Sequence, residues 1–291
     1  MPSVTTQPDP AGPDGSDEPA ARVSRSGRNL PVALAVGIVL AALVLVTIYH
    51  WPVGFVVLVV VVFEVAVIEL ATALATAAVR PGVAPLVLGT AAMVVAAYNG
   101  GLPALAVAFA ATVLVVQFWR LVSKPEGSVR DVTAGVWVAT YPGFLGSFAV
   151  LMFAQPHGAD RIVVFIGAVV CSDVGGYAVG VFLGRHRLAP SLSPKKSWEG
   201  LAGSVVACVV GGWLLAGWLL HTHWWQGVLL GLAIVCVATL GDLMESMVKR
   251  DLGVKDMGRL LPGHGGVMDR LDSLVPVAPV AYVLLTLFIG G

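Results

Sequence analysis

The chain has 291 residues, of which 57% are hydrophobic and only 12% are charged, and its mean hydropathy is +0.89. Soluble globular domains carry about 25% charged residues, so this composition excludes an ordinary water-soluble enzyme and also excludes a disordered chain. Basic and acidic residues each number 17, and this balance gives no reason to expect nucleic acid as a partner. The composition predicts an integral membrane protein embedded in the lipid bilayer.

The first 29 residues are rich in Pro, Asp, Ser and Gly and contain almost no bulky apolar side chain. We expect residues 1–29 to form a disordered cytoplasmic tail, because such a segment has too little apolar surface to bury. The apolar run after Arg28 is long enough to span a bilayer. We therefore interpret it as a retained first helix rather than a cleaved signal peptide.

Apolar runs of about 20 residues, the length that crosses a bilayer as a helix, recur along the rest of the chain. They predict an all-α polytopic bundle of about nine transmembrane helices, near residues 30–49, 53–77, 82–98, 102–119, 132–154, 161–183, 201–220, 225–247 and 273–290. Some connections, such as residues 99–101, are very short. Several neighbouring helices are therefore expected to form antiparallel hairpins.

The basic residues are distributed unevenly over the loops. If the N-terminus is cytoplasmic, sixteen of the 17 lysines and arginines fall on the cytoplasmic side, and only Arg161 falls on the other. Cytoplasmic loops of membrane proteins carry an excess of Lys and Arg. The pattern predicts a multi-pass protein of the cell (inner or plasma) membrane with its N-terminus in the cytoplasm.

Four polar residues of the eighth run share one face of the expected helix. Asp242, Glu245, Ser246 and Lys249 are spaced at i, i+3, i+4 and i+7, which places them on a single stripe. A charge at the bilayer centre costs at least about 2.5 kcal/mol, so the stripe needs a partner. It either lines a polar cavity or forms an internally paired cluster that only anchors helix packing.

Other polar positions in the apolar runs are open to simpler explanations. Gly176, Gly180 and Gly184 repeat at every fourth position and predict close helix packing, which leaves Asp173 as the functional member of that helix. Two further acidic residues, Glu64 and Glu69, are five apart and do not share a helix face. For them the sequence leaves open a lipid cavity and a polar crevice between helices.

The segment from Lys249 to Ser273 has an unusual composition for a membrane loop. It combines five basic residues, the turn Pro-Gly-His-Gly-Gly at 262–266, and acidic residues at 256, 269 and 272. Glycines let backbone N–H groups approach an oxyanion, and Lys and Arg supply charge, so the combination suits a polyphosphate. The excess of basic residues in cytoplasmic loops explains the charge, but not the glycines, the histidine or the interleaved carboxylates.

This segment resembles the signature of the phosphatidate cytidylyltransferases (CDP-diacylglycerol synthases), which reads S-x-x-K-R, K-D, P-G-H-G-G and D-R-x-D. The matching residues are Ser246, Lys249, Arg250, Lys255, Asp256, Pro262, Gly263, His264, Gly265, Gly266, Asp269, Arg270 and Asp272. A second similar element is SPKKSWEG at 193–200, with Ser197 where the family more often has Thr. A third contains Asp173 and the glycine repeat, with Gly176 where Ala is common. The resemblance covers roughly residues 160–290.

The resemblance implies a nucleotidyltransferase that condenses CTP with phosphatidic acid, giving CDP-diacylglycerol and pyrophosphate for phospholipid biosynthesis. In that reaction a phosphate oxygen of the lipid attacks the α-phosphorus of CTP, and pyrophosphate leaves with the help of a divalent cation. Both reactants are anionic, so positioning and electrostatics are the main contribution of the protein. We expect residues 30–154 to hold helices one to five, and residues 155–291 to hold a catalytic unit of helices six to nine with cytoplasmic loops at 185–199 and 248–272.

The resemblance also implies roles for individual residues. The cation-binding aspartates fall at Asp242 and Asp269, whose hard oxygens suit Mg²⁺, and a second, monovalent cation is left open. The residues expected to be catalytic are Lys249, Arg250, His264, Asp269 and Asp242. The residues expected to bind substrate are Asp173, Lys195, Lys196, Ser197, Glu199, Ser246, Lys255, Gly265, Gly266 and Arg270. His264 either hydrogen-bonds the leaving pyrophosphate or only holds the loop, and Asp272 is either catalytic or the cap of the ninth helix.

Two other functions stay open at this point. One is a nucleotidyl or phosphoryl transferase that acts on a different membrane lipid phosphate, such as an isoprenoid-linked one. The other is a secondary transporter, which also has many helices and intramembrane acids, but transporters often show inverted repeats. We find no repeat, and the polar residues cluster at one face. Whether the protein forms a homodimer is also left open.

Overall fold

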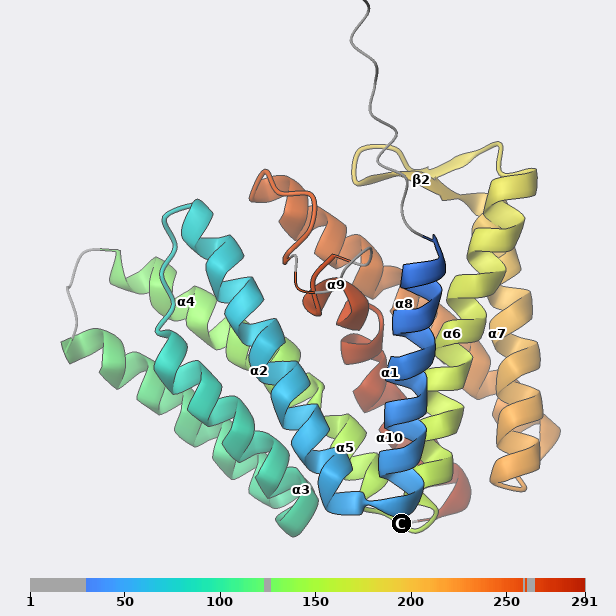
Figure 1. Ribbon diagram of the computed structural model, residues 1–291, viewed down its shortest axis with the longest axis horizontal. Coiled ribbons are helices and arrows are strands. Elements are labelled where there is room, and N and C mark those ends of the chain that lie inside the picture. Colours follow the sequence, from blue (N-terminus) through green and yellow to red (C-terminus); the bar gives the residue numbers. More distant parts are fainter. Residues whose placement is uncertain (1–29, 123–126, 259, 261–264, 291) are drawn as a thin grey trace, which may run out of the picture.

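The computed structural model describes residues 30–122, 127–258, 260 and 265–290, so the predicted tail at 1–29 lies outside the described residues. It is a bundle of helices with one short β-hairpin (Figure 1). The elements are α1 (Leu30–His50), α2 (Pro52–Thr76), α3 (Val83–Val122), α4 (Ser128–Val138), the π-helix η1 (Ala139–Leu145), α5 (Ser147–Phe153), α6 (Gly158–Leu183), β1 (Arg187–Ala189), β2 (Ser193–Ser197), α7 (Trp198–Leu219), α8 (Trp224–Asp251), α9 (Met268–Leu271) and α10 (Leu274–Ile289).

The length and surface of these helices are those of a membrane protein. Within the described residues, seven helical segments are long and apolar enough to cross a bilayer: Pro52–Thr76, Val83–Val122, Ser128–Phe153, Gly158–Leu183, Trp198–Leu219, Trp224–Asp251 and Met268–Ile289. Many large apolar side chains on their outer faces are exposed, which suits contact with lipid tails. The structure therefore bears out a polytopic helical membrane protein, while the count of nine spans and the orientation stay predictions.

The element α3 contains both of the short apolar runs expected at 82–98 and 102–119. Its backbone leaves the helical region at Gly101, where φ is 66° and ψ is −160°. A Cβ atom added to Gly89 would lie 2.2 Å from the Thr112 side chain, and one added to Gly82 would lie 2.7 Å from Trp119. The two halves therefore pack against each other in antiparallel fashion (Figure 1). The backbone angles place the turn between them at Gly101.

The fifth expected helix is divided into α4, η1 and α5. Pro142 lies inside η1, and proline lacks the N–H that an α-helical hydrogen bond requires, which explains why the helix widens there. Next to this proline, the hydroxyl of Tyr141 donates a hydrogen bond to the backbone oxygen of Asp272 (3.0 Å). The irregular turn thus brings the N-terminal half of the chain against the segment between α9 and α10.

The glycine repeat of α6 confirms the prediction of close helix packing. A Cβ atom on Gly200 of α7 would lie 3.1 Å from the backbone oxygen of Gly176 and 3.3 Å from Cα of Gly180. A Cβ atom on Gly176 would lie 2.3 Å from the hydroxyl of Ser204. Backbone-to-backbone contact of this kind requires small residues at the interface. It fixes α7, and the β-hairpin that leads into it, against α6.

Arg161 has a structural explanation for its position on the side with few basic residues. Its side chain is fully buried at the start of α6 and donates to the backbone oxygens of Pro156 (3.0 Å) and Gly290 (2.7 Å) and to the side chain of Gln155. The guanidinium therefore joins the turn between α5 and α6 to the end of α10 through these hydrogen bonds. It does not behave as a free loop charge.

The loops expected at 185–199 and 248–272 contain short regular elements. The first contains the antiparallel hairpin β1–β2 and the start of α7, which adds one small sheet to a helical bundle. The second overlaps α8, which continues through Lys249 and Arg250 to Asp251, and it also contains α9. Basic residues are favourable in the last turn of a helix because of its dipole, so an end defined by loss of apolar character was placed too early.

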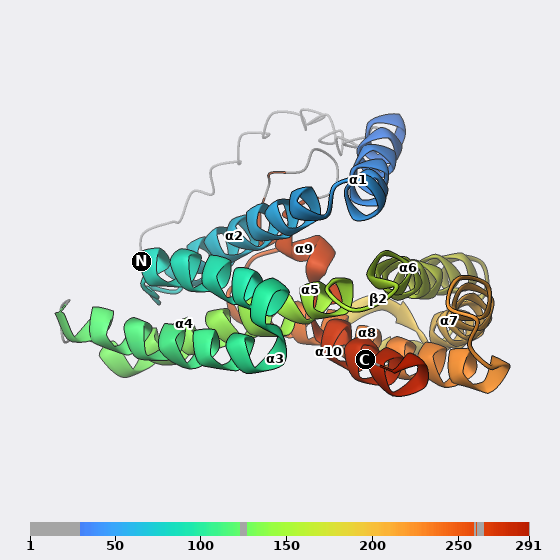
Figure 2. The same ribbon diagram turned by 90° about the horizontal axis from the view of Figure 1, so that it is seen from below.

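The functional segments converge at one end of the bundle. Figure 1 places the β-hairpin, the C-terminal end of α8 and the start of α1 toward the same end. Figure 2 shows α9 between α2 and α6. The short α9 contacts helices from both halves of the chain, α2 and α10.

Candidate active site

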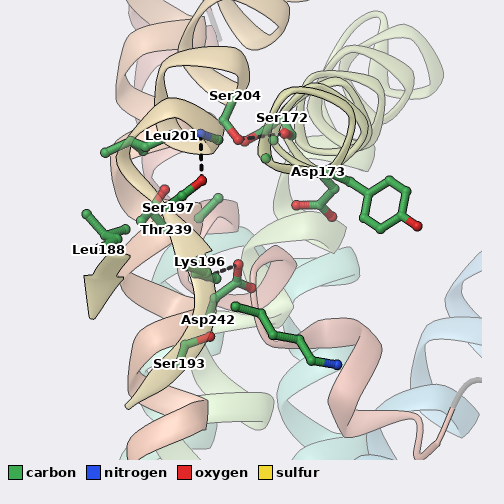
Figure 3. A pocket seen from close by; sticks show the side chains of 16 residues that line it. Ser172, Asp173, Leu188, Ser193, Lys196, Ser197, Leu201, Ser204, Thr239 and Asp242 are labelled. Atoms are coloured by element: carbon green, nitrogen blue, oxygen red, sulfur yellow. Dashed lines mark hydrogen bonds and ion pairs between the residues drawn. The ribbon is translucent and has the colours of Figure 1, made fainter. Parts of the chain in front are cut away.

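A cavity of about 340 Å³ opens between α6, the β-hairpin, α7 and α8 (Figure 3). Its lining is rich in hydroxyl, carboxylate and lysine side chains and in glycine: Ser172, Asp173, Gly176, Tyr177, Gly180, Leu188, Ser193, Lys195, Lys196, Ser197, Gly200, Leu201, Ser204, Ala238, Thr239 and Asp242. Small residues at the contact between α6 and α7, together with polar residues of the hairpin, therefore form one polar cavity.

An ion pair crosses this cavity. Nζ of Lys196 on β2 lies 2.5 Å from Oδ2 of Asp242 on α8, and both side chains are about a quarter exposed. Asp173 of α6 lines the same hollow (Figure 3), close enough to act electrostatically on Asp242 and Lys196. The cavity thus carries fixed charges of both signs, which suits an anionic ligand bound together with a cation.

A second charged cluster lies one turn further along α8. Nζ of Lys249 is 2.8 Å from Oε2 of Glu245 and also pairs with Asp269 of α9. The Asp269 carboxylate accepts hydrogen bonds from the backbone N–H groups of Met257 (3.0 Å) and Gly266 (2.8 Å). The side chains of Glu245 and Asp269 are only 4% exposed, so this cluster is buried and paired.

Asp272 connects the cavity to the buried cluster. Its carboxylate lies close enough to Asp242 and Glu245 to act on both electrostatically. The predicted stripe on α8 is therefore divided: Asp242 faces the cavity, whereas Glu245 and Lys249 form the paired cluster. Asp272 itself accepts a hydrogen bond from the N–H of Ser273 (2.8 Å), and it lies between α9 and α10 rather than inside either helix.

The carboxylates present have the chemistry that a hard divalent cation requires. Asp173 and Asp242 line the cavity, Glu245 and Asp269 lie in the buried cluster, and Mg²⁺ is typically held by one or two carboxylates plus phosphate oxygens. Within the described part of the chain, the acidic side chains do not converge in threes on one point. Lys196 and Lys249 now lie against the two aspartates expected to bind metal, Asp242 and Asp269. Each of these two aspartates therefore already has a positively charged group beside it.

Three of the expected substrate-site and catalytic residues hold the hairpin in place. Ser197 caps α7 by accepting a hydrogen bond from the N–H of Gly200 (3.1 Å). Glu199 accepts from the N–H of Arg185 (3.0 Å) and lies 2.6 Å from the ring of His186. Arg250 donates to the backbone oxygen of Leu192 (2.7 Å). Ser197 also lines the cavity. Glu199 and Arg250 instead hold the β-hairpin that forms one wall of the cavity.

The remaining expected residues are more scattered. Lys195 lines the cavity with an exposed side chain. Ser246 is half-buried on α8, Lys255 is exposed after it, and Arg270 is exposed on α9. Gly265 has a left-handed φ of 84°, and Gly266 donates to Asp269 as described. His264 lies outside the described residues.

Several residues around the site were not singled out from the sequence. Thr239 lines the cavity three residues before Asp242, so helical spacing from Asp242 would have found it. Ser172 lines it next to Asp173. Tyr141 comes from the N-terminal half, where the sequence offered no motif. Glu69, in contrast, was singled out by the cost of a charge in an apolar run, and the structure places it against α9.

The fold and site define a polytopic membrane protein with a charged cavity at one end of its helical bundle, beside a glycine-rich segment. The chain belongs to the cytidylyltransferase family, whose model matches residues 31–288. This confirms the resemblance and the class of enzyme, a nucleotidyltransferase. The match also includes the N-terminal helices, beyond the residues 160–290 on which the resemblance was based.

Curated relatives agree with this assignment. The chain is 43% identical over 279 residues to a phosphatidate cytidylyltransferase of Mycobacterium leprae, covering 90% of this chain and 89% of the relative. It is 39% identical over 283 residues to a protein of the same name from Mycobacterium bovis, covering 93% and 92%. A phosphatidate cytidylyltransferase of Brucella suis is 42% identical over 149 residues, covering 51% of this chain and 55% of the relative.

Proposed function

We propose that this protein transfers the cytidylyl group of CTP to phosphatidic acid, forming CDP-diacylglycerol and pyrophosphate. The observation that carries the proposal is the cavity in which Lys196 and Asp242 pair beside the buried Lys249–Asp269 cluster. The surrounding residues belong to the segments that carry the family signature. The relatives named above add support, because they are similar along most of the chain.

The chain's own residues have defined tasks in this reaction. Lys195 and Lys196 line the cavity and would lie against phosphate oxygens of CTP, whose charge must be offset before an anionic lipid can approach. An oxygen of the lipid phosphate then attacks the α-phosphorus. The bond to the β-phosphate oxygen breaks, and pyrophosphate leaves with that electron pair. Lys249 stabilises the buried cluster next to the cavity by neutralising Glu245 and Asp269.

Asp242 and Asp269 would hold Mg²⁺, with a second, monovalent cation as a further part of the proposal. When bound, the divalent ion supplies positive charge to phosphate oxygens that the two carboxylates alone would repel. Arg270 would bind substrate, and His264 would either hydrogen-bond the leaving pyrophosphate or hold the loop.

We further propose the orientation that the basic residues predict. The chain would cross the cell membrane nine times, counting α1 and the two halves of α3, with the N-terminus and the site in the cytoplasm. The hairpin and the end of α8 lie toward one end of the bundle, which supports a single cytoplasmic location for the site. We also propose that the protein forms a homodimer. A measurement of its molecular mass in detergent would test this.

For the lipid that accepts the cytidylyl group, one specific alternative to phosphatidic acid has to be tested. An isoprenoid-linked phosphate offers the same attacking oxygen on a single chain. The test is to supply purified protein with CTP and Mg²⁺ in liposomes that contain either dioleoyl phosphatidic acid or a polyprenyl phosphate at equal mole fraction. We expect a cytidylylated lipid only with phosphatidic acid. Equal or greater transfer to the polyprenyl phosphate would overturn the assignment of the acceptor.

A further inference from the structure

Glu69 of α2 reaches from the N-terminal half of the chain into the signature segment. Its Oε2 accepts a hydrogen bond from the backbone N–H of Met268, at the start of α9, with an N···O distance of 2.9 Å. The two residues are 199 positions apart in sequence. The sequence had left open whether this carboxylate lines a lipid cavity or a polar crevice, and the structure places it against α9.

Two glycines of the signature segment enclose the same carboxylate. A Cβ atom on Gly258 would lie 2.1 Å from Oε1 of Glu69, and one on Gly266 would lie 2.5 Å from Oε2. Real Cβ atoms essentially never approach other atoms so closely. The absence of side chains at these two positions is therefore what lets Glu69 enter the segment.

The residues that Glu69 contacts also hold Asp269. The N–H of Gly266 donates to Asp269 Oδ2 at 2.8 Å, and the N–H of Met257, next to Gly258, donates to the same oxygen at 3.0 Å. Glu69 and Asp269 therefore contact neighbouring backbone groups of the same two short pieces of chain, at 257–258 and 266–268. Lys249 completes the arrangement by pairing with Asp269.

We propose that Glu69 is a positioning residue for the transferase reaction, which fixes the backbone around Gly258, Gly266 and Met268 so that Asp269 and Lys249 keep their places. This inference rests on the proposed function, because Asp269 and Lys249 are assigned there. A carboxylate in an apolar helix is costly, and the backbone hydrogen bond repays part of that cost. The N-terminal helices are thereby part of the active site's support.

The first test compares three variants of α2 as folded, detergent-purified full-length protein. Glu69→Leu removes the acceptor and should lower kcat at least tenfold, with the KM for CTP changed less than threefold. Glu69→Gln retains a carbonyl oxygen of the same reach and should keep kcat within about threefold of wild type. Thr72→Val is the matched control, because the Thr72 hydroxyl donates to the backbone oxygen of Ile68 in its own helix, and it should behave as wild type.

A second readout does not depend on activity. Hydrogen exchange of the Met268 amide should accelerate at least tenfold in Glu69→Leu but not in Glu69→Gln or Thr72→Val. Unchanged exchange and unchanged kcat in Glu69→Leu would overturn the inference, whatever the substrate. If wild type shows the protected amide but makes no product from CTP, the proposed function fails and the contact stands.

A glycine variant keeps the inference testable if Glu69→Leu does not fold. Gly258→Ala should lower kcat because the new methyl group meets Glu69, whereas the double variant Gly258→Ala/Glu69→Ala should be no less active than Glu69→Ala alone. Gly217→Ala is the control, because a Cβ atom there meets nothing within 4 Å. Losses that simply multiply in the double variant would show that Glu69 and Gly258 act independently, and would contradict the proposal.

Discussion

Lys196 on strand β2 and Asp242 on helix α8 form an ion pair of 2.5 Å across the cavity, although 46 residues separate them. Exposed ion pairs contribute little to stability, and this pair is about a quarter exposed on each side. Its importance is positional. It fixes the hairpin over the end of α8 and keeps a cation and a carboxylate available to a ligand.

Replacing Lys196 tests its assignment to the nucleotide. Lys196→Met should raise the KM for CTP at least about tenfold, equivalent to about 1.4 kcal/mol, because one cation facing the phosphates is lost. Lys196→Arg retains the charge and should recover much of the affinity. Steady-state kinetics with varied CTP check this, and a change confined to the KM for the lipid would contradict the assignment.

Asp242 and Asp269 should be indispensable if both bind the divalent cation. Asp242→Asn and Asp269→Asn should each lower turnover at least about a hundredfold, equivalent to about 2.7 kcal/mol. The double variant should be much less than additive, since either loss already dismantles the site. Turnover titrated with Mg²⁺ provides the measurement. Near-normal activity with unchanged metal dependence would place the metal elsewhere.

Arg161 should matter for stability and not for chemistry. Arg161→Met removes the charged donor to the backbone oxygens of Pro156 and Gly290, and a hydrogen bond to a charged group contributes about 1.5–3 kcal/mol. The variant should unfold at a lower temperature in detergent, while kcat per folded molecule at low temperature stays normal. A stability equal to that of wild type would show that these hydrogen bonds are replaced.

Membrane orientation is testable by labelling. In a background without Cys171, Cys208 and Cys236, single cysteines at Pro190, in the hairpin, and at His221, between α7 and α8, should react from opposite sides. Both positions are exposed, and α7 alone separates them. Labelling of Pro190→Cys from outside intact cells, or of both cysteines from one side, would reject the proposed topology.

Much of the bundle follows from apolar length alone, and the details that escaped have physical causes. The sequence predicted α6, α7, α8 and α10 to within a few residues, except that α8 continues to Asp251. Polarity gave no sign of the hairpin β1–β2, which forms by pairing within a basic loop. The widening at Pro142 likewise depends on a local loss of hydrogen bonding, which a hydropathy window does not register.

The site was predictable where a motif crosses it and not elsewhere. The stripe on α8 and the lysines of β2 were found because their spacing or their resemblance marked them. The sequence did not predict which of these residues form ion pairs. The pairs Lys196–Asp242 and Lys249–Asp269 depend on how distant elements pack together. The sequence marked Glu69 as a charge in an apolar run but gave no sign of its partner, and it gave no sign of Tyr141, because the partners of both residues lie over 100 residues away.

Cytidylyl transfer is tested most directly by following the α-phosphate of CTP. Purified protein in liposomes of phosphatidic acid is supplied with Mg²⁺ and with CTP labelled at either the α- or the γ-phosphate. We expect the α-label to enter the lipid and the γ-label to appear in pyrophosphate in equal amount. Both should happen only when CTP and phosphatidic acid are present together. Release of the γ-label without phosphatidic acid, or its transfer to the lipid, would contradict cytidylyl transfer.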